Sequence, residues 1–171
     1  MMPVRCSQRN QKGVTLMEMM IILVIIGVMA AMAVPQWLEA MPRLRAQSEA
    51  REVVSTLRTA RSLSISRKEL FGVSFSPSDN LYKTFINRET PGTPSWTPGD
   101  SLVDSTCVGR EVALASQTFP TSAVVFNPDG SASASGAIAL VSGDSTVTFT
   151  IDVLASTGRI RLTETPGPPS T

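Results

Sequence analysis

The sequence begins with a polar stretch and then changes to a long apolar run. Between Val14 and Val34, only Thr15 and Glu18 carry polar side chains. As a helix, these 21 residues would extend about 31 Å, close to the hydrocarbon thickness of a bilayer. A cleaved secretory signal has a shorter apolar core of about 7–15 residues. The pattern therefore predicts a membrane-spanning helix over residues 14–34.

Apolar residues then recur at helical spacing, at Leu38, Met41, Ala50, Val53, Leu57, Ala60 and Leu63. This spacing predicts that the helix continues over residues 35–70, with one apolar stripe whose later half packs on a sheet. Pro35 and Pro42 should kink or locally open the helix. We expect its basic face to be solvated; the alternative is pairing with acidic parts of neighbouring subunits.

From Phe71 onward the pattern changes to short strand-like runs separated by turn residues. The predicted strands are 71–75, 81–86, 111–114, 124–126, 137–141, 146–154 and 159–162. Residues 90–106, with three prolines and two glycines, predict a long irregular loop, and residues 166–171 a disordered tail. The fold class is therefore α+β. A long N-terminal helix packs on a small, mostly antiparallel sheet, within a globular domain of residues 71–165.

Residue usage excludes several kinds of function. The chain has no histidine, so it lacks the most frequent general base and the usual zinc ligand. From Glu69 onward five bases face ten acids, which argues against a surface that coats nucleic acid broadly. The two cysteines are Cys6 and Cys107, and a chain that lost its first residues would keep a single thiol. No metal, cofactor or catalytic residue is predicted.

Charge alone leaves the direction of membrane crossing open. Three bases precede the apolar run and three follow it within the range that the positive-inside rule counts: Arg5, Arg9 and Lys12, then Arg43, Arg45 and Arg51. The C-terminal part looks like a translocated domain, so we expect a cytoplasmic N-terminus. Glu18 lies only about 6 Å along the helix from Val14. This position near the interface reduces the cost of about 2.5–3.5 kcal/mol that a charge has at the membrane centre.

Lys12-Gly13-Val14-Thr15-Leu16-Met17-Glu18, followed by an apolar run that ends at Pro35, resembles the processing signal of type IV prepilins and type II secretion pseudopilins. The resemblance implies a leader of residues 1–13, cut after Gly13 by a prepilin peptidase that also N-methylates Val14. The family most often has Phe or Met at the variable place of Val14. The resemblance further implies a single-pass protein of the bacterial inner membrane with a periplasmic globular domain. Such a protein joins other pilin-like subunits in a filament, at an inner-membrane assembly platform.

Processing of this kind would give Glu18 a charged partner. Cleavage creates an α-amine on Val14 that is mostly protonated near neutral pH. Glu18 could pair with the amine of a neighbouring subunit in the apolar filament core. It could also pair with its own amine, because four residues bring both groups to one helix face. We therefore expect Glu18, together with Pro35, to serve assembly.

Three further segments resemble the GspH/FimT family of minor pseudopilins and minor pilins: Ala60-Arg61-Ser62, Phe126-Asn127-Pro128-Asp129-Gly130 and Gly158-Arg159-Ile160-Arg161-Leu162. On a strand, Arg159 and Arg161 would point to one face about 7 Å apart, near the spacing of successive phosphates. In FimT-like minor pilins this element is linked to DNA binding. We prefer the alternative, an edge strand whose arginines are solvated or paired with acids such as Asp152.

We therefore expect a non-enzymatic minor pseudopilin that helps to assemble or cap a type II secretion pseudopilus for protein export. The alternative is a minor pilin of a type IV pilus that binds DNA through Arg159 and Arg161. Gly99-Asp100-Ser101-Leu102 matches the signature of a serine hydrolase family. Because the chain has no histidine to activate Ser101, we interpret this match as accidental.

Overall fold

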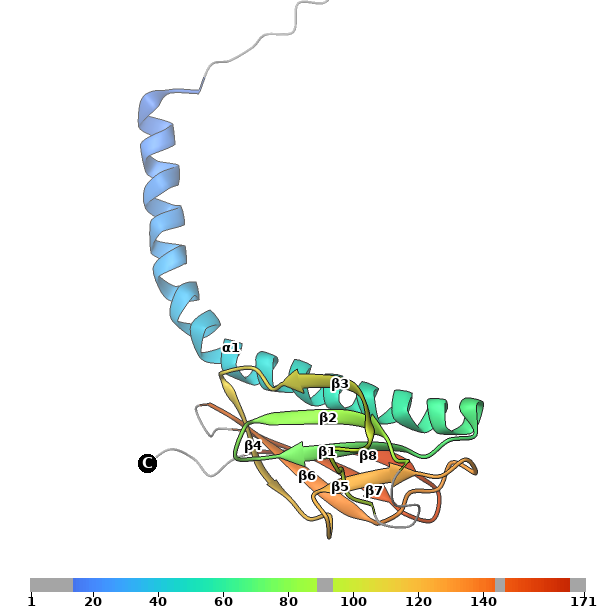
Figure 1. The fold of residues 1–171 in the computed structure, drawn as a ribbon. Coiled ribbons are helices and arrows are strands. Elements are labelled where there is room, and N and C mark those ends of the chain that lie inside the picture. The colour runs from blue at the N-terminus through green and yellow to red at the C-terminus, as the bar shows by residue number, and fades with distance from the viewer. Residues whose placement is uncertain (1–13, 89–93, 144–146, 167–171) are drawn as a thin grey trace, which may run out of the picture. The chain divides into compact units, whose positions relative to one another are not determined.

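The computed structural model of the 171-residue chain describes residues 14–88, 94–143 and 147–166. Within these ranges lie one helix and eight strands (Figure 1): α1 Leu16–Arg67, β1 Phe71–Ser76, β2 Leu81–Ile86, β3 Ser101–Cys107, β4 Val112–Gln117, β5 Ala123–Phe126, β6 Gly136–Ser142, β7 Val147–Leu154 and β8 Arg159–Pro166. The chain divides into two compact units, Met1–Glu39 and Ala40–Thr171. Each unit is described by itself.

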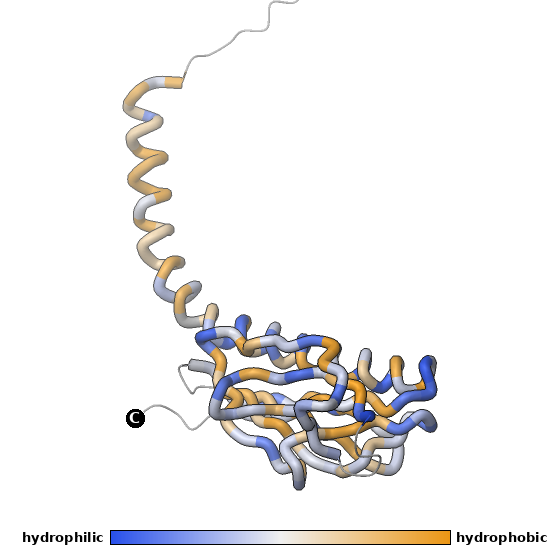
Figure 2. Tube along the Cα trace, in the orientation of Figure 1, coloured by the Kyte–Doolittle hydropathy of each residue, from blue (hydrophilic) through white to orange (hydrophobic). Residues whose placement is uncertain are grey.

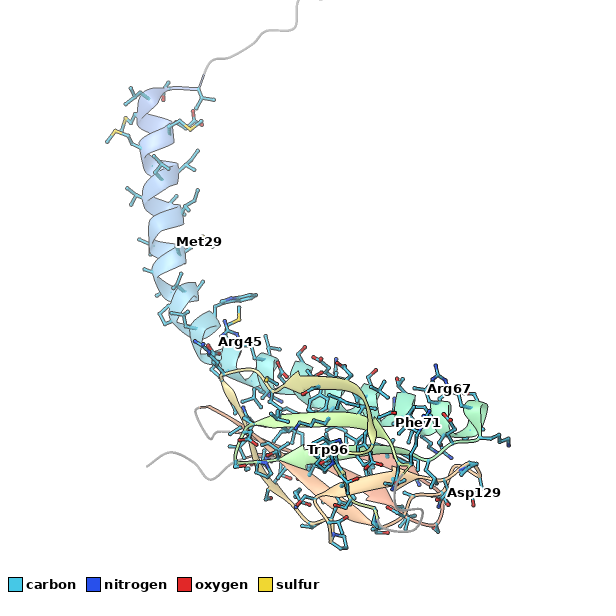
Figure 3. All side chains as sticks on the ribbon, in the orientation of Figure 1. Met29, Arg45, Arg67, Phe71, Trp96 and Asp129 are labelled. Carbon is cyan, nitrogen blue, oxygen red and sulfur yellow. The ribbon has the colours of Figure 1, made fainter. Side chains whose placement is uncertain are left out.

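The first unit contains the apolar part of α1. Its segment Leu16–Pro35 has a mean hydropathy of 2.5 and is long and apolar enough to cross a membrane. Every residue of this segment is exposed. Figure 2 shows the segment as mostly apolar, and Met29, labelled in Figure 3, lies on the helix surface. The helix continues through Pro35 and Pro42, so neither proline ends it.

In the second unit, α1 buries one face, as the spacing of its apolar residues predicts. Fully buried positions on this face are Ala46, Ala50, Val53, Leu57 and Ala60. Their spacing of three and four residues keeps them on one side of the helix. The sequence predicts that the helix continues to residue 70, but in the structure it ends at Arg67. It ends there because Lys68 adopts a left-handed φ of 59°.

The strands form two four-stranded antiparallel sheets rather than the single sheet that the sequence predicts. Their strand orders are β3-β2-β1-β5 and β4-β6-β7-β8. Buried residues of both sheets, such as Phe71 in β1 and Phe149 in β7, form one core with Leu57 of α1. Alternation along a strand shows which face is buried, but not which strands pair. The pattern therefore could not reveal the division into two sheets.

Strand β3 lies in the segment that the sequence analysis assigned to an irregular loop, and this part of the prediction is wrong. β3 is an edge strand whose Leu102 and Val103 are 52% and 48% exposed. Its register with β2 skips Val103 at a bulge, which disrupts the period of two that identifies a strand. The seven predicted strands all have counterparts. β8 includes Pro166, and the rest of the predicted tail lies outside the described residues.

Asn80, in the turn between β1 and β2, connects the two sheets. Its Nδ2 donates to the Val112 carbonyl oxygen at 2.8 Å, and its Oδ1 accepts from the Leu114 N–H at 2.8 Å. Both partners lie in β4, the first strand of the second sheet. The left-handed φ of 51° at Asn80 is one that asparagine tolerates better than most residues.

Tyr82 is buried in β2, and its hydroxyl lies close to both α1 and β3. Burial raises the pKa of this hydroxyl above its usual value. Glu52 and Glu49 act in the same direction, while hydrogen bonds with Thr56 and Thr106 lower it. The balance favours the neutral phenol in the folded protein.

Candidate functional site

The first turn of α1 begins at Leu16, shortly after the predicted processing site between Gly13 and Val14. Gly13 lies outside the described residues, and Val14 is exposed. Thr15 caps the helix, because its Oγ1 accepts a hydrogen bond from the Glu18 backbone N–H at 3.2 Å. Thr-x-x-Glu is the spacing of a capping box, a signal that the sequence analysis missed.

The hydrogen bond to Thr15 holds the backbone of Glu18 in the first turn of the helix. Glu18 is in the first helical turn, near the positive end of the helix dipole, and it is exposed. Pairing of Glu18 with the Val14 amine, either of a neighbouring subunit or of its own chain, stays a prediction. The exposed apolar side chains around Glu18 leave this part of the helix available for contact with lipid or with other helices.

The three segments that carry the GspH/FimT resemblance meet at Arg61. Its Nε donates to the Gly130 carbonyl oxygen at 2.8 Å, and its Nη2 donates to the Thr157 carbonyl oxygen at 2.9 Å. One turn later, the Ser64 hydroxyl lies 3.1 Å from the Asn127 carbonyl oxygen. We call these five residues, together with Gly158, the Arg61 clasp.

Gly158 belongs to the clasp because of its backbone. It has a left-handed φ of 59°, which glycine adopts without strain. A Cβ there would collide with the Gly130 carbonyl oxygen and lie 2.8 Å from Arg61 Nε. The clasp therefore joins the end of α1 to the turn after β5 and to the turn before β8. Figure 3 labels Asp129 in the first of these turns.

The two arginines of the Gly-Arg-Ile-Arg element are placed as the strand pattern predicts. Arg159 and Arg161 are exposed on the edge strand β8, whereas Ile160 and Leu162 are half-buried against the core. The predicted division of this strand into an arginine face and an apolar face is therefore confirmed.

Arg159 and Arg161 line an open groove of about 500 Å³. Asp152, Thr118 and Ser135 also line it. Asp152 is the register partner of Arg161 across β7 and β8. Among the described residues, however, no ion pair within 4.0 Å includes Asp152 or either arginine. The groove thus presents two solvated guanidinium groups beside one carboxylate. The negative charge of this carboxylate offsets part of the attraction that the two guanidinium groups have for an anion.

Part of the basic surface of α1 is used within the chain. Arg43 donates two hydrogen bonds to one carboxylate oxygen of Glu164 in β8, from Nη2 at 2.7 Å and from Nε at 3.0 Å. Arg45 forms an ion pair with Glu111. Arg51 and Arg58 are exposed farther along the helix, so the predicted solvated face is observed there.

Asp100 and Ser101 have positions that fit a structural role. Asp100 is buried and accepts hydrogen bonds from the backbone N–H groups of Arg88 and Thr97, each at 2.9 Å, and from the Thr97 hydroxyl at 3.0 Å. It therefore holds the loop that leads into β3, of which Ser101 is the first residue. Cys107, at the end of β3, has an exposed free thiol. The described part of the chain contains no group of three or more residues that could hold a metal ion.

Comparison with known proteins connects the start of the chain to pilin-like proteins. Residues 8–34 match the prokaryotic N-terminal methylation motif. A fimbrial protein of Pseudomonas aeruginosa is 38% identical over 82 residues, which cover 48% of this chain and 53% of that protein. The chain thus spans about half the length of the curated relatives it matches.

Two solved structures share the fold. The minor pseudopilin EpsH from the type 2 secretion system of Vibrio cholerae has a TM-score of 0.57 and 11% identity, over 74% of this chain and 99% of EpsH. The type IV minor pilin FimU of Pseudomonas aeruginosa has a TM-score of 0.56 and 16% identity, over 75% of this chain and 96% of FimU. The family described as type II transport protein GspH matches residues 49–163, more than half of the sequence, and the chain therefore belongs to the GspH family.

Proposed function

We propose that this chain is a minor pseudopilin of a type II secretion system, which helps to assemble or cap the periplasmic pseudopilus for protein export. The observation that carries the proposal is the GspH family match over residues 49–163, because this family is described as a type II transport protein. The fold shared with the pseudopilin EpsH supports it. In this role the chain has no catalytic activity of its own.

The proposal includes processing and anchoring. A prepilin peptidase cuts the leader after Gly13 on the cytoplasmic side and methylates the new amine of Val14. The apolar helix then holds the chain in the inner membrane, with the globular unit in the periplasm, until other pilin-like subunits and the assembly platform take it into the filament. The match to the N-terminal methylation motif and the exposed apolar segment support this sequence of events.

Deletion of the gene tests the proposal directly. If the chain serves secretion, a secreted enzyme should accumulate in the periplasm of the deletion strain and should leave the cell again when the gene is restored. Unchanged secretion, together with loss of twitching or natural transformation, would contradict the proposal and favour a pilus.

Glu18 allows a separate test of the assembly step. We expect Glu18→Ala to leave the precursor inserted and cleaved but to reduce its incorporation into filaments, because the Val14 amine loses its carboxylate partner. Glu52→Ala, which removes an exposed carboxylate from the second unit, is the matched control. Equal incorporation of the two variants would show that Glu18 has no assembly role.

The second candidate function is that of a minor pilin of a type IV pilus that contacts DNA. It is favoured by the exposed, solvated Arg159 and Arg161 and by the fold shared with FimU. If it holds, the full chain in detergent should shift duplex DNA, with an affinity that falls as salt increases. Arg159→Ala with Arg161→Ala should weaken this shift, whereas Arg110→Ala, at another exposed arginine, should not. Equal binding by both variants would remove the groove from consideration.

A further inference from the structure

An exposed apolar face of α1 lies at the end of its membrane-length segment. Trp37 is 64% exposed and follows Pro35 by two residues. Together with Ala33, Val34 and Leu38, it lines a shallow apolar hollow of about 240 Å³. These four residues form two pairs at a spacing of four, so they share one helix face. No residue of this face is covered by another described part of the chain.

Tryptophan has a specific preference at such a position. Its ring is large and apolar, but its indole N–H needs a hydrogen-bond partner. For this reason tryptophan is enriched where the hydrocarbon of a bilayer meets its headgroups. Trp37 lies at such a boundary in the sequence, since the apolar segment ends at Pro35 and the bases Arg43 and Arg45 follow within ten residues.

The position of Glu18 independently supports placing Trp37 at the boundary between hydrocarbon and headgroups. Glu18 and Trp37 are 19 residues apart, which corresponds to about 28 Å along a helix. The hydrocarbon core of a bilayer is about 30 Å thick. If Trp37 lies at one interface, Glu18 reaches the other, where its charge costs least. The preference of the indole and the cost of the carboxylate therefore place the helix at the same depth.

We propose that the face formed by Ala33, Val34, Trp37 and Leu38 contacts the lipid headgroup region and the adjoining acyl chains, at the bilayer surface opposite the leader. The ring of Trp37 packs on the acyl chains, and its indole N–H donates to headgroup oxygens or interfacial water. This contact keeps Val14 at the other bilayer surface, where a peptidase that acts at that surface can reach it. The inference rests on the membrane insertion included in the proposed function.

Depth-dependent fluorescence quenching tests the contact. The chain has two tryptophans, so Trp96→Phe leaves Trp37 as the only reporter. The full precursor is reconstituted into phosphatidylcholine vesicles that contain lipid brominated either near the headgroup end or near the methyl end of the acyl chains. We expect the shallow bromine to quench Trp37 about twofold more strongly, because tryptophan concentrates at the interface. In the matched control, Trp37→Phe leaves only Trp96, which neither lipid should quench.

Two other outcomes would overturn the proposal and are distinguishable. Stronger quenching by the deep bromine would place Trp37 in the hydrocarbon core, which contradicts the interfacial contact but not the membrane span. If neither lipid quenches Trp37, alkaline extraction of the vesicles decides between two explanations. A chain that stays in the membrane has this face covered by a second helix, which contradicts the lipid contact. A chain that is extracted was never inserted, which contradicts the membrane anchoring in the proposed function as well.

Discussion

Removing the guanidinium of Arg61 should lower the free energy of unfolding of the second unit by about 2–4 kcal/mol. Arg61 donates two hydrogen bonds, to the carbonyl oxygens of Gly130 and Thr157, at 2.8 and 2.9 Å. A hydrogen bond from a charged group contributes about 1.5–3 kcal/mol. The two bonds sum to about 3–6 kcal/mol. Because Arg61 is partly exposed, solvent screening reduces this sum by about one third. Loss of these bonds would detach the end of α1 from two turns at once.

Arg61→Met is the appropriate change, since it keeps most of the aliphatic stem and removes every donor. The matched control is Arg58→Met, three residues earlier on the same helix, where the arginine is exposed. A surface change of this kind should alter stability by no more than about 0.5 kcal/mol. Urea unfolding of the full chain in mild detergent would be followed by Trp96 emission in a Trp37→Phe background, so that the second unit alone is observed.

The result that would refute this reasoning is an Arg61→Met variant as stable as Arg58→Met. In that case the hydrogen bonds of Arg61 would be replaced by water at no cost, and the clasp would not stabilise the fold. Arg61→Lys separates charge from geometry. A lysine keeps the charge but cannot direct two fixed donors at two carbonyl groups, so it should recover less than half of the loss.

Three further changes test other parts of the second unit. Gly158→Ala should lower the free energy of unfolding, measured with urea, by about 3 kcal/mol, because a left-handed φ strains alanine and the new Cβ collides with the Gly130 carbonyl oxygen. A decrease of less than about 1 kcal/mol would contradict the geometry of the turn. Asn80→Ala should lower the free energy of unfolding by about 2–3 kcal/mol, because it loses both hydrogen bonds to β4. Asn80→Gly loses the same bonds but tolerates the left-handed φ, so it should be about 1 kcal/mol more stable than Asn80→Ala. Equal stability of Asn80→Ala and the unchanged chain would exclude a role of Asn80 in joining the sheets. Tyr82 is the single tyrosine, so tyrosinate absorbance should titrate with a pKa above its usual value of about 10. Because the pKa is raised in the folded state, the stability from the neutral phenol is complete below that usual value and is lost as pH rises through the folded pKa. Tyr82→Phe should remove this loss, and identical pH profiles would contradict it.

Features with a strong local pattern could be predicted from the sequence. The apolar segment, the buried stripe of α1 and the two faces of β8 all follow from the periodicity of apolar residues. β3 could not be predicted, because an exposed edge strand with a bulge has no buried face to generate alternation. The division into two sheets depends on strand pairing between distant residues, which no local pattern contains.

The candidate site shows the same limit. The sequence identified the segments around Arg61, Gly130 and Gly158 by resemblance, but not that they touch. Their contact depends on a side chain that reaches backbone carbonyl groups 69 and 96 residues away. The Thr15 cap was different, since its Thr-x-x-Glu spacing was present in the sequence and was overlooked.

The glycine and the arginines of Gly158-Arg159-Ile160-Arg161 therefore have separate roles. Gly158 is required by the clasp, because any side chain there would meet the Gly130 carbonyl oxygen and Arg61. Arg159 and Arg161 take no part in the hydrogen bonds of the clasp and are exposed to solvent. A chain that uses this clasp needs the glycine whether its filament serves secretion or DNA uptake, so the glycine does not indicate DNA binding. Loss of DNA binding in Gly158→Ala would therefore reflect a disturbed fold. Only changes confined to Arg159 and Arg161, in a protein whose urea midpoint is unchanged, can decide whether the groove binds DNA.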